Sequence, residues 1–382
     1  MRCLLDDAIL LDPEAAAPEP GALLIEDGRI RARLPVGATS PDARRYSLGG
    51  RMLAPGFLDV HYHGGLIFDA QGLDGAMRDA ASLVTHGTTG YLATTVAWAP
   101  EELLGRLEGL VAAQAAAPPG AQPLGVHLEG PWIHPEAAGA QPSAGIRPFD
   151  ASEAETILAA GAGRIRMVTL APELEGATRL LERLAQRGVV GALGHSRAST
   201  EQALGGVDAG ARHVTHLFNA MGPFHHREPG LAGVAMADSR LSADLICDGV
   251  HVHPLALSFA ARALGERLLA ITDQLAPPPG ETSFGSGALH ASDVAWRTES
   301  GALAGSRLHM DEALRNLEGF AELSILEAVS ACTLRPARLI GVEGERGSLR
   351  VGARADLVVL DPDRTVHETW VGGRCLFGPS AG

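Results

Sequence analysis

The sequence predicts an α/β protein in which a closed (β/α)8 barrel of the TIM type is joined to a small β-sandwich domain built from both ends of the chain. Short apolar or β-branched runs alternate with alanine- and leucine-rich amphipathic segments over most of the 382 residues. This alternation is typical of parallel strands joined by helices. There are eight such units, and eight βα units favour a closed barrel over an open sheet.

The expected barrel strands are short apolar runs between residues 55 and 273. They lie at 55–63, 88–96, 123–129, 165–171, 189–195, 211–217, 243–250 and 268–273. Helical segments separate them, among them GAMRDAASLVTHG, PEELLGRLEGLVAAQAAA, GATRLLERLAQRG and STEQALGGVDAG, with apolar residues near every 3.6 positions. The barrel is predicted to occupy residues 53–345.

Both ends of the chain are expected to form strands of a second domain. The stretch ALLIEDGRIRARL, at 21–33, predicts two strands around an Asp27-Gly28 turn. Near the other end, DLVVLDPDRTVHETWVGGRCLF predicts further strands with a Gly372-Gly373 turn. Because neither end alone can cover both faces of a sheet, we expect residues 1–52 and 346–382 to pair in one small domain.

Composition excludes several classes of function. The formal net charge of −14 and the lack of clustered Lys and Arg argue against a nucleic-acid partner. A few local cations could still hold a small anionic substrate. The four cysteines are far apart and form no CxxC pair, which argues against a disulfide framework and a thiolate zinc site. Acidic residues near the N-terminus and the lack of a long apolar run predict a cytoplasmic protein without a membrane partner.

Polar side chains gather at the ends of the predicted strands. In LDVHYHGG, at 58–65, Asp59, His61 and His63 share one face because alternate strand residues point the same way. Four later strands end on Glu129, His195, His216 and Asp273. One such residue alone is usually structural, but six of them, the two histidines of the first strand and these four, converging at the C-terminal mouth of a barrel favour an active site. Burying these groups together is costly unless a divalent metal accepts their imidazole and carboxylate donors.

Several stretches carry a resemblance to a known family and together run nearly end to end. They are APGFLDVHYHGG, GVHLEGPWI, GALGHS, VTHLFNAM with REPGLAG, DGVHVHP, AITDQLAPPPG, ALAGSRLHMDEALRN and GSLRVGARADLVVLD. The chain resembles the amidohydrolase superfamily and, within it, the N-acetylglucosamine-6-phosphate deacetylases. The HxH motif and the tail are shared across the superfamily, whereas HLEGP, HLFNAM…REPG and DGVH indicate the deacetylases.

The resemblance implies a metal centre at these strand ends. Glu129, His195 and His216 would form the primary site, with water in the open fourth position of a catalytic arrangement. Because this chain keeps the HxH motif, His61 and His63 are implied as ligands of a second ion, with Glu129 as a candidate bridge. We expect one or two divalent ions per chain; zinc is favoured, and iron, cobalt and manganese suit the same ligands.

The resemblance also implies the reaction and its substrate. Asp273 matches the family's catalytic aspartate, which takes a proton from water and gives it to the leaving nitrogen. The reaction would release acetate from N-acetylglucosamine 6-phosphate, leaving glucosamine 6-phosphate. Arg227 would hold the phosphate, because its planar guanidinium suits phosphate oxygens. His251 would orient or polarise the ligand. The implied substrate contacts are Ala140, Asn219, Ala220, Arg227, His251, Leu303 and Ala304. The protein is expected to be a homodimer, as relatives commonly are.

Two loops depart from the family pattern. Ala138 and Gln141 stand where the family has a lysine and a histidine, and Gln274-Leu275 follow the aspartate where it has alanine and methionine. Both loops are expected to border the substrate and not the metal, so the hydrolytic machinery is better supported than the sugar. The alternatives are a deacetylase of another amino sugar phosphate, such as the galactosamine epimer, or of a smaller N-acyl compound, and a non-catalytic sugar-phosphate-binding relative. A cyclic-amide hydrolase is disfavoured by Glu129 and by the setting of Arg227.

The remaining polar candidates have structural interpretations. Without its flanking motif, Arg227 would be interpreted as the partner of Glu228 in a surface salt bridge. His127 shares the face of Glu129 and either supports it or is a core histidine. The other histidines are expected to be solvated, to stand behind the ligands or to play no part in the site; they are His86, His134, His213, His225, His226, His253, His290, His309 and His367.

Overall fold

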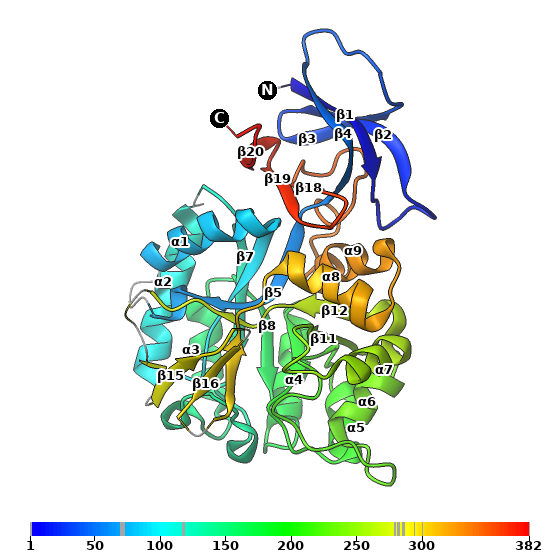
Figure 1. Ribbon diagram of the computed structural model, residues 1–382. Helices are drawn as coiled ribbons and strands as arrows, with labels where there is room; N and C mark the ends of the chain where they lie inside the picture. Colours follow the sequence, from blue (N-terminus) through cyan, green and yellow to red (C-terminus); the bar gives the residue numbers. More distant parts are fainter. Residues whose placement is uncertain are drawn as a thin grey trace.

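The computed structural model describes residues 2–68, 73–116, 119–278, 280, 283–284, 287–293, 295–299 and 301–381. Figure 1 shows a barrel surrounded by helices, with strands from both ends of the chain side by side above it. The predicted fold class is therefore confirmed. No helix in these residues has the length and apolar character needed to cross a membrane.

The barrel strands pair in chain order and lie close to their predicted positions. They are β5 (Phe57–Gly64), β6 (Thr88–Thr94), β7 (Gln122–Glu129), β8 (Ile165–Leu170), β9 (Val190–Leu193), β10 (His213–Val214), β11 (Ser242–Ile246) and β12 (Leu268–Ile271). β10 is shorter than expected. The chain leaves extended geometry at His216 (φ 34°), Phe218 (φ 79°) and Ala220 (φ 51°), which ends the ladder early.

The barrel closes between β12 and β5 through the side chain of Asp59. Its carboxylate accepts a hydrogen bond from the Thr272 hydroxyl (2.5 Å) and a longer one from the Thr272 backbone N–H (3.3 Å). The backbone N–H of Asp273 donates to the His61 carbonyl (2.9 Å). β13 (Gln274–Leu275) then pairs in parallel with β5. Burial raises the pKa of Asp59 to about 6, although these hydrogen bonds lower it.

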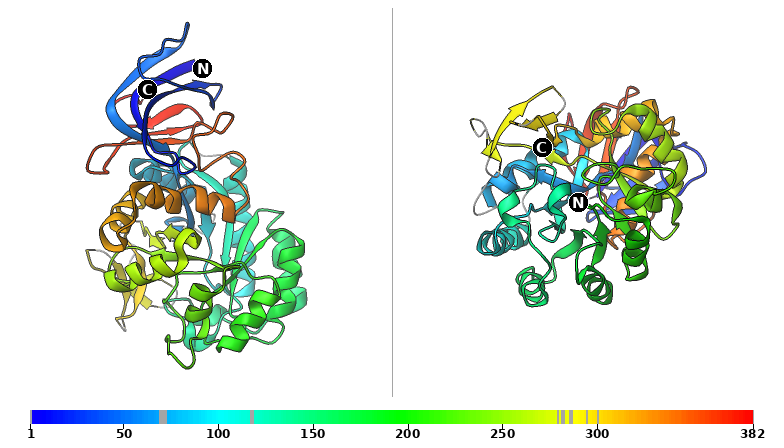
Figure 2. Two further views of the ribbon diagram at one scale, coloured as in Figure 1. Left: turned by 90° about the vertical axis from the view of Figure 1, so that its right-hand side faces the viewer. Right: turned by 90° about the horizontal axis from the view of Figure 1, so that it is seen from below.

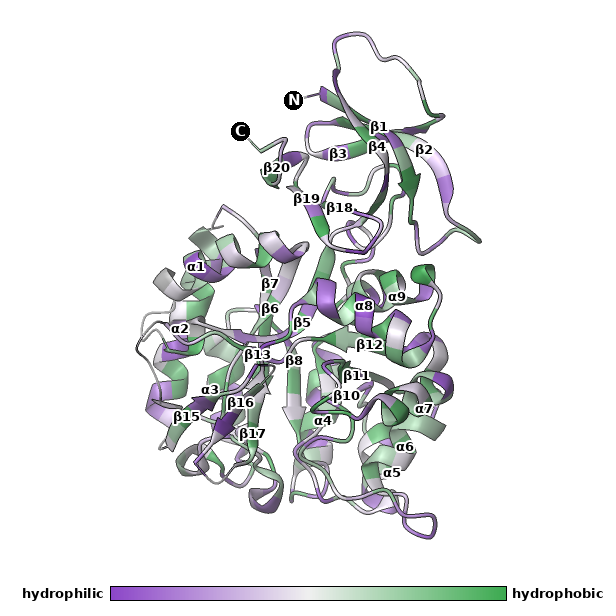
Figure 3. Ribbon diagram, in the orientation of Figure 1, coloured by the Kyte–Doolittle hydropathy of each residue, from purple (hydrophilic) through white to green (hydrophobic). Residues whose placement is uncertain are grey.

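Helices cover the outside of the barrel (Figure 2). They are α1 (Leu73–Leu83), α2 (Pro100–Ala116), α3 (Ala151–Ala160), α4 (Ala177–Gln186), α5 (Thr200–Asp208), α6 (Gly230–Ala237), α7 (Pro254–Leu264), α8 (Met310–Ala321), α9 (Ile325–Cys332) and α10 (Leu334–Leu339). α4 shows why they pack this way, because its leucines at 180, 181 and 184 are buried while Arg179 and Glu182 face solvent. The same division of apolar and polar faces is visible in Figure 3.

An antiparallel extension that the sequence analysis did not predict follows β13. It consists of β14 (Ser283–Phe284), β15 (Gly287–Ala291), β16 (Ala295–Thr298) and β17 (Leu303–Ser306). β17 returns to the barrel and pairs in parallel with β13, Ser306 opposite Gln274. This return brings the predicted substrate contacts Leu303 and Ala304 to the cavity that Asp273 also lines.

The small domain is one curved sheet of seven strands drawn from both chain ends. Its strands are β1 (Arg2–Leu10), β2 (Glu19–Glu26), β3 (Arg29–Leu34), β4 (Arg44–Pro55), β18 (Leu357–Leu360), β19 (Val366–Val371) and β20 (Arg374–Phe377), in the order β20-β19-β18-β4-β1-β2-β3. Residues from both ends share one core, among them Leu5, Leu23, Leu357 and Trp370. The domain boundaries at 52/53 and 345/346 stay predictions. All four cysteines are free and buried.

Candidate metal centre and active site

Glu129, His195 and His216 meet where β7, β9 and β10 end. Glu129 Oε1 lies 3.1 Å from Nε2 of each histidine, and the two Nε2 atoms are 3.0 Å apart. All three side chains are buried. His195 and His216 have positive φ angles of 47° and 34°, which L-residues rarely adopt. The residues expected to form the primary metal site therefore lie together.

The hydrogen bonds of His195 show that this group fits a cation. Its Nδ1 lies 2.8 Å from the carbonyl oxygen of Ala137, which can only accept, so Nδ1 carries the hydrogen. A neutral His195 therefore presents the Nε2 lone pair to the Glu129 carboxylate and to His216. Electron pairs that face one another in a buried site need a positive charge between them. Imidazole and carboxylate donors in this arrangement suit a divalent metal.

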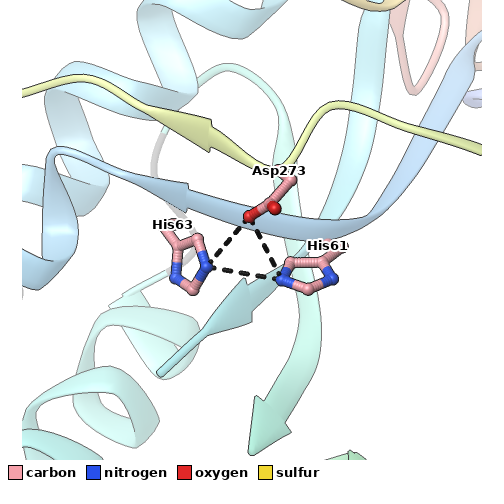
Figure 4. Close-up of side chains that lie close together, drawn as sticks. All are labelled: His61, His63 and Asp273. Carbon is pink, nitrogen blue, oxygen red and sulfur yellow. Dashed lines mark hydrogen bonds and ion pairs between the residues drawn. The ribbon is translucent and has the colours of Figure 1, made fainter. Parts of the chain in front are cut away.

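A second group consists of His61, His63 and Asp273, at the ends of β5 and β12. Figure 4 shows the two rings and the carboxylate pointing toward one another. Nε2 of His61 lies 3.3 Å from Nε2 of His63, and Asp273 Oδ1 lies 3.4 and 3.1 Å from these two atoms. His63 Nδ1 faces the carbonyl oxygen of Thr94 at 3.2 Å, so in the neutral ring Nε2 would also point a lone pair inward. This group likewise has the donors for a divalent ion.

Glu129 lies between the two groups. Its Oε1 is 3.3 Å from His61 Nε2, and its Oε2 is 3.3 Å from His63 Nε2. Burial raises the pKa of Glu129, but the charge of His61 and the close contacts with His195 and His216 outweigh it and hold the pKa well below its usual value. The carboxylate is thus ionised; its Oε1 faces His61 as well as His195 and His216, and its Oε2 faces His63.

The same contacts with carboxylates raise the pKa values of two of the histidines. Burial lowers the pKa of His63, but hydrogen bonds to Asp273 and Glu129 outweigh it and raise the pKa to about 10. For His216, a hydrogen bond to Glu129 outweighs burial and raises the pKa to about 9. Without a metal, protons would therefore supply the positive charge that the carboxylates require.

A cavity of about 240 Å³ opens beside both groups. Six of the seven predicted substrate contacts line it, namely Ala140, Asn219, Ala220, His251, Leu303 and Ala304. Nδ1 of His251 is held by the Asp248 carboxylate at 2.6 Å. Among the residues that the structure describes, His251 Nε2 and Asn219 Nδ2 are buried without a hydrogen-bond partner. Both of these nitrogen atoms are available to hydrogen-bond with a polar ligand in the cavity.

Arg227 lies apart from this cavity. Its side chain is exposed, and its Nη1 donates to His226 Nε2 at 2.9 Å. Glu228 instead accepts hydrogen bonds from the backbone and hydroxyl of Thr200. The residue expected to bind phosphate is therefore not among those that line the cavity of its own chain.

The two divergent loops follow the expectation in part. The loop after β7 lines the cavity with Ala140 and Gln141, as expected, but Gln141 also contacts a proposed metal ligand, because its Nε2 donates to Glu129 Oε2 at 2.5 Å. Gln274 turns away from the cavity toward His309 (3.1 Å), whereas Leu275 lines it. A loop path that folds back over a strand end is not encoded in a local sequence pattern.

The proposed ligands are supported by further side chains, one of which was not predicted from the sequence. Asp244, in β11, accepts hydrogen bonds from the backbone N–H of His216 and from His213 Nε2, the latter at 2.8 Å. In the sequence, Asp244 could have been recognised as a carboxylate inside the otherwise apolar run SADLI. His127 is a fully buried histidine whose Nε2 is 2.7 Å from the Thr169 hydroxyl.

Comparisons with known proteins place this site in a family context. The amidohydrolase family model matches residues 52–376. An N-acetylgalactosamine-6-phosphate deacetylase of Escherichia coli O157:H7 is 36% identical over 92% of this chain and 93% of its own length. The human N-acetylglucosamine-6-phosphate deacetylase is 36% identical over 95% of this chain and 90% of its own.

A solved structure is similar throughout. A mutant of the N-acetyl-D-glucosamine-6-phosphate deacetylase of Mycobacterium smegmatis, in complex with N-acetyl-D-glucosamine-6-phosphate, superposes with a TM-score of 0.90 at 35% identity. The match covers 98% of this chain and 99% of that one. The likeness therefore includes the small domain as well as the barrel.

Proposed function

The chain belongs to the amidohydrolase family, and from this membership we propose that it hydrolyses the amide of N-acetylglucosamine 6-phosphate. Water adds to the acetyl carbonyl and the C–N bond breaks, which gives acetate and glucosamine 6-phosphate. The observation that carries the proposal is the convergence of Glu129, His195 and His216 beside Asp273, at a cavity in a chain whose relatives are such deacetylases.

Asp273 is the proposed proton carrier. Burial raises its pKa, but the charges of His61 and His63 and a hydrogen bond from His63 lower it to about 2. The carboxylate is therefore ionised at neutral pH and can take a proton from the attacking water. It then delivers that proton to the amine nitrogen as the C–N bond breaks. His251, fixed by Asp248, is proposed to orient the acetyl group.

A divalent ion is the proposed cofactor, held by Glu129, His195 and His216. It supplies the Lewis acidity that activates water and polarises the amide carbonyl. We propose zinc, with a second ion at His61, His63 and Asp273, because the Glu129 carboxylate contacts histidines of both groups. Zinc content per chain, measured for the wild type and for a His61→Ala/His63→Ala variant, tests this: two ions should fall to one.

The galactosamine epimer is the second candidate substrate. It is favoured by the E. coli relative, an N-acetylgalactosamine-6-phosphate deacetylase at 36% identity, and by Gln141 in place of the family's histidine in a loop that lines the cavity. Acetate release from both N-acetylhexosamine 6-phosphates and from the free sugars is the deciding experiment. We expect the highest kcat/KM with N-acetylglucosamine 6-phosphate. Binding without acetate release from any of them would instead identify a sugar-phosphate-binding protein.

Two further properties are proposed from the resemblance alone. We propose that the chain works as a homodimer, which sedimentation of the purified protein would test. We also propose a cytoplasmic location, which fractionation of the native host would test.

A further inference from the structure

We propose that Gln141 is a positioning residue that sets the orientation of the Glu129 carboxylate and thereby the metal affinity of the centre. The proposal rests on the metal centre proposed above and adds a residue whose type departs from the family pattern. Gln141 stands in the loop after β7, twelve positions beyond Glu129, and its side chain returns to the end of that strand.

The amide of Gln141 makes two hydrogen bonds that fix which way it faces. Its Oε1 accepts from the backbone N–H of Ala97 at 2.8 Å, and its Nε2 donates to Glu129 Oε2 at 2.5 Å. Turning the amide over would set its oxygen against the carboxylate and its NH2 against the Ala97 N–H. Both contacts would then be repulsive, so only one orientation is compatible with these neighbours.

The anchor of Gln141 is rigid. Ala97 is fully buried in the segment after β6. Gly145 packs so closely there that a Cβ atom would lie 1.7 Å from the Ala97 carbonyl oxygen, so only glycine fits. Arg147 ties the two segments together, because its Nη1 donates to the carbonyl oxygens of Trp98 (2.8 Å) and Gly145 (2.6 Å).

The same segment holds Glu129 from two sides. Thr95 Oγ1 accepts the backbone N–H of Glu129 at 3.2 Å, while Ala97 reaches its carboxylate through Gln141. The plane of the carboxylate decides which histidines its two oxygens face. In the observed orientation, Oε1 faces His195, His216 and His61, and Oε2 faces His63. Rotation of this plane would misplace both oxygens, so Gln141 acts on both groups.

The experiment measures zinc affinity in the absence of substrate. Zn²⁺ is titrated into the metal-free full-length protein in competition with a chromophoric chelator, for the wild type, Gln141→Leu and Gln122→Leu. Loss of a hydrogen bond that orients a metal ligand typically weakens affinity about 10–100-fold, and we expect this for Gln141→Leu. Gln122 is the matched control, since it begins the strand that Glu129 ends and its Nε2 donates to the Gly120 carbonyl oxygen. Its replacement should leave zinc affinity unchanged.

Two further variants separate the role of Gln141 from folding and from substrate binding. Gln141→Asn keeps the amide but is one methylene too short to reach both partners, so it should weaken zinc binding even if Gln141→Leu does not fold. Gln141→His keeps an N–H donor and should retain more affinity than the leucine variant. Wild-type zinc affinity in Gln141→Asn, with a raised KM for the sugar phosphate, would overturn the proposal and make Gln141 a substrate contact. A wild-type protein that binds no zinc would refute the metal centre itself, and the proposal with it.

Discussion

Asp273 Oδ1 lies 3.1 Å from His63 Nε2, so the proposed proton carrier belongs to the same group as two proposed metal ligands. The resemblance assigned metal binding to His63 and proton transfer to Asp273. Their contact couples these two roles, because any change in the charge of His63 alters the basicity of Asp273.

Replacement of Asp273 by Asn should remove most turnover but spare the primary metal. An amide cannot take the proton of water, so we expect kcat to fall about 10²–10⁴-fold, the usual contribution of a positioned acid–base group. Glu129, His195 and His216 are untouched, so at least one zinc per chain should remain. Steady-state kinetics and metal analysis on the same preparation check both points. A wild-type kcat would exclude Asp273 as the proton carrier.

Zinc binding to the metal-free protein should release protons at pH 8. His63 and His216 have pKa values raised to about 10 and about 9, so both are protonated at pH 8 and must lose their protons to become ligands. Release should diminish as the pH approaches 10. Calorimetric titrations in buffers of different ionisation enthalpy count the protons. An enthalpy independent of the buffer would show that these histidines are already neutral.

The same raised pKa values predict how the metal-free protein responds to pH. A raised pKa in the folded state gives stability that is complete below the unfolded value of 6.5 and is lost as the pH rises through the folded values. The contribution of these histidines should therefore decline between pH 6.5 and 10. The melting temperature across this range, with and without zinc, checks the sign.

Removing the hydroxyl of Thr272 should weaken the closure of the barrel. In Thr272→Val the buried Asp59 carboxylate loses its 2.5 Å hydrogen bond, and bonds to charged groups contribute about 1.5–3 kcal/mol. We expect a loss of unfolding free energy of that size by urea denaturation. Thr85→Val is the control, because the Thr85 hydroxyl donates to a backbone carbonyl at an exposed position. Equal losses of unfolding free energy for the two substitutions would contradict a special role for the Asp59–Thr272 hydrogen bond in barrel closure.

Arg227→Ala should discriminate between phosphorylated and free sugars. If the guanidinium binds the phosphate, KM should rise for the 6-phosphate substrate far more than for its unphosphorylated form. Only the former has phosphate oxygens that the guanidinium can bind. The exposed position of Arg227 in the single chain makes large effects on folding unexpected. A similar change for both substrates would count against the phosphate role.

Much of the barrel and of the site could be predicted because both follow from periodic patterns. Apolar runs mark the buried strands, and parallel strands of a barrel end at the same mouth. Residues as far apart in sequence as His61 and Asp273 could therefore be expected to meet, and they do. The resemblance then separated the proposed ligands from the other buried histidines, such as His127 and His213.

The parts that were not predicted depend on loop paths. Nothing in the local sequence shows that Gln141 returns to Glu129, or that Asp244 holds the backbone of His216. The extension β14–β17 was missed for a different reason. Its strands are two to five residues long and interrupted by glycine and serine, so they are too short to show alternation.

The pairing of β4 affects how the protein can fold while it is being synthesised. One of its edges pairs with β1, but the other pairs with β18, Pro55 opposite Leu357. At about 5–20 residues per second, the roughly 300 residues between these partners take tens of seconds to emerge from the ribosome. During that time the second edge of β4 has no native partner and is open to intermolecular pairing. A chain that stops before β18 should therefore aggregate even though every residue of the barrel has been made.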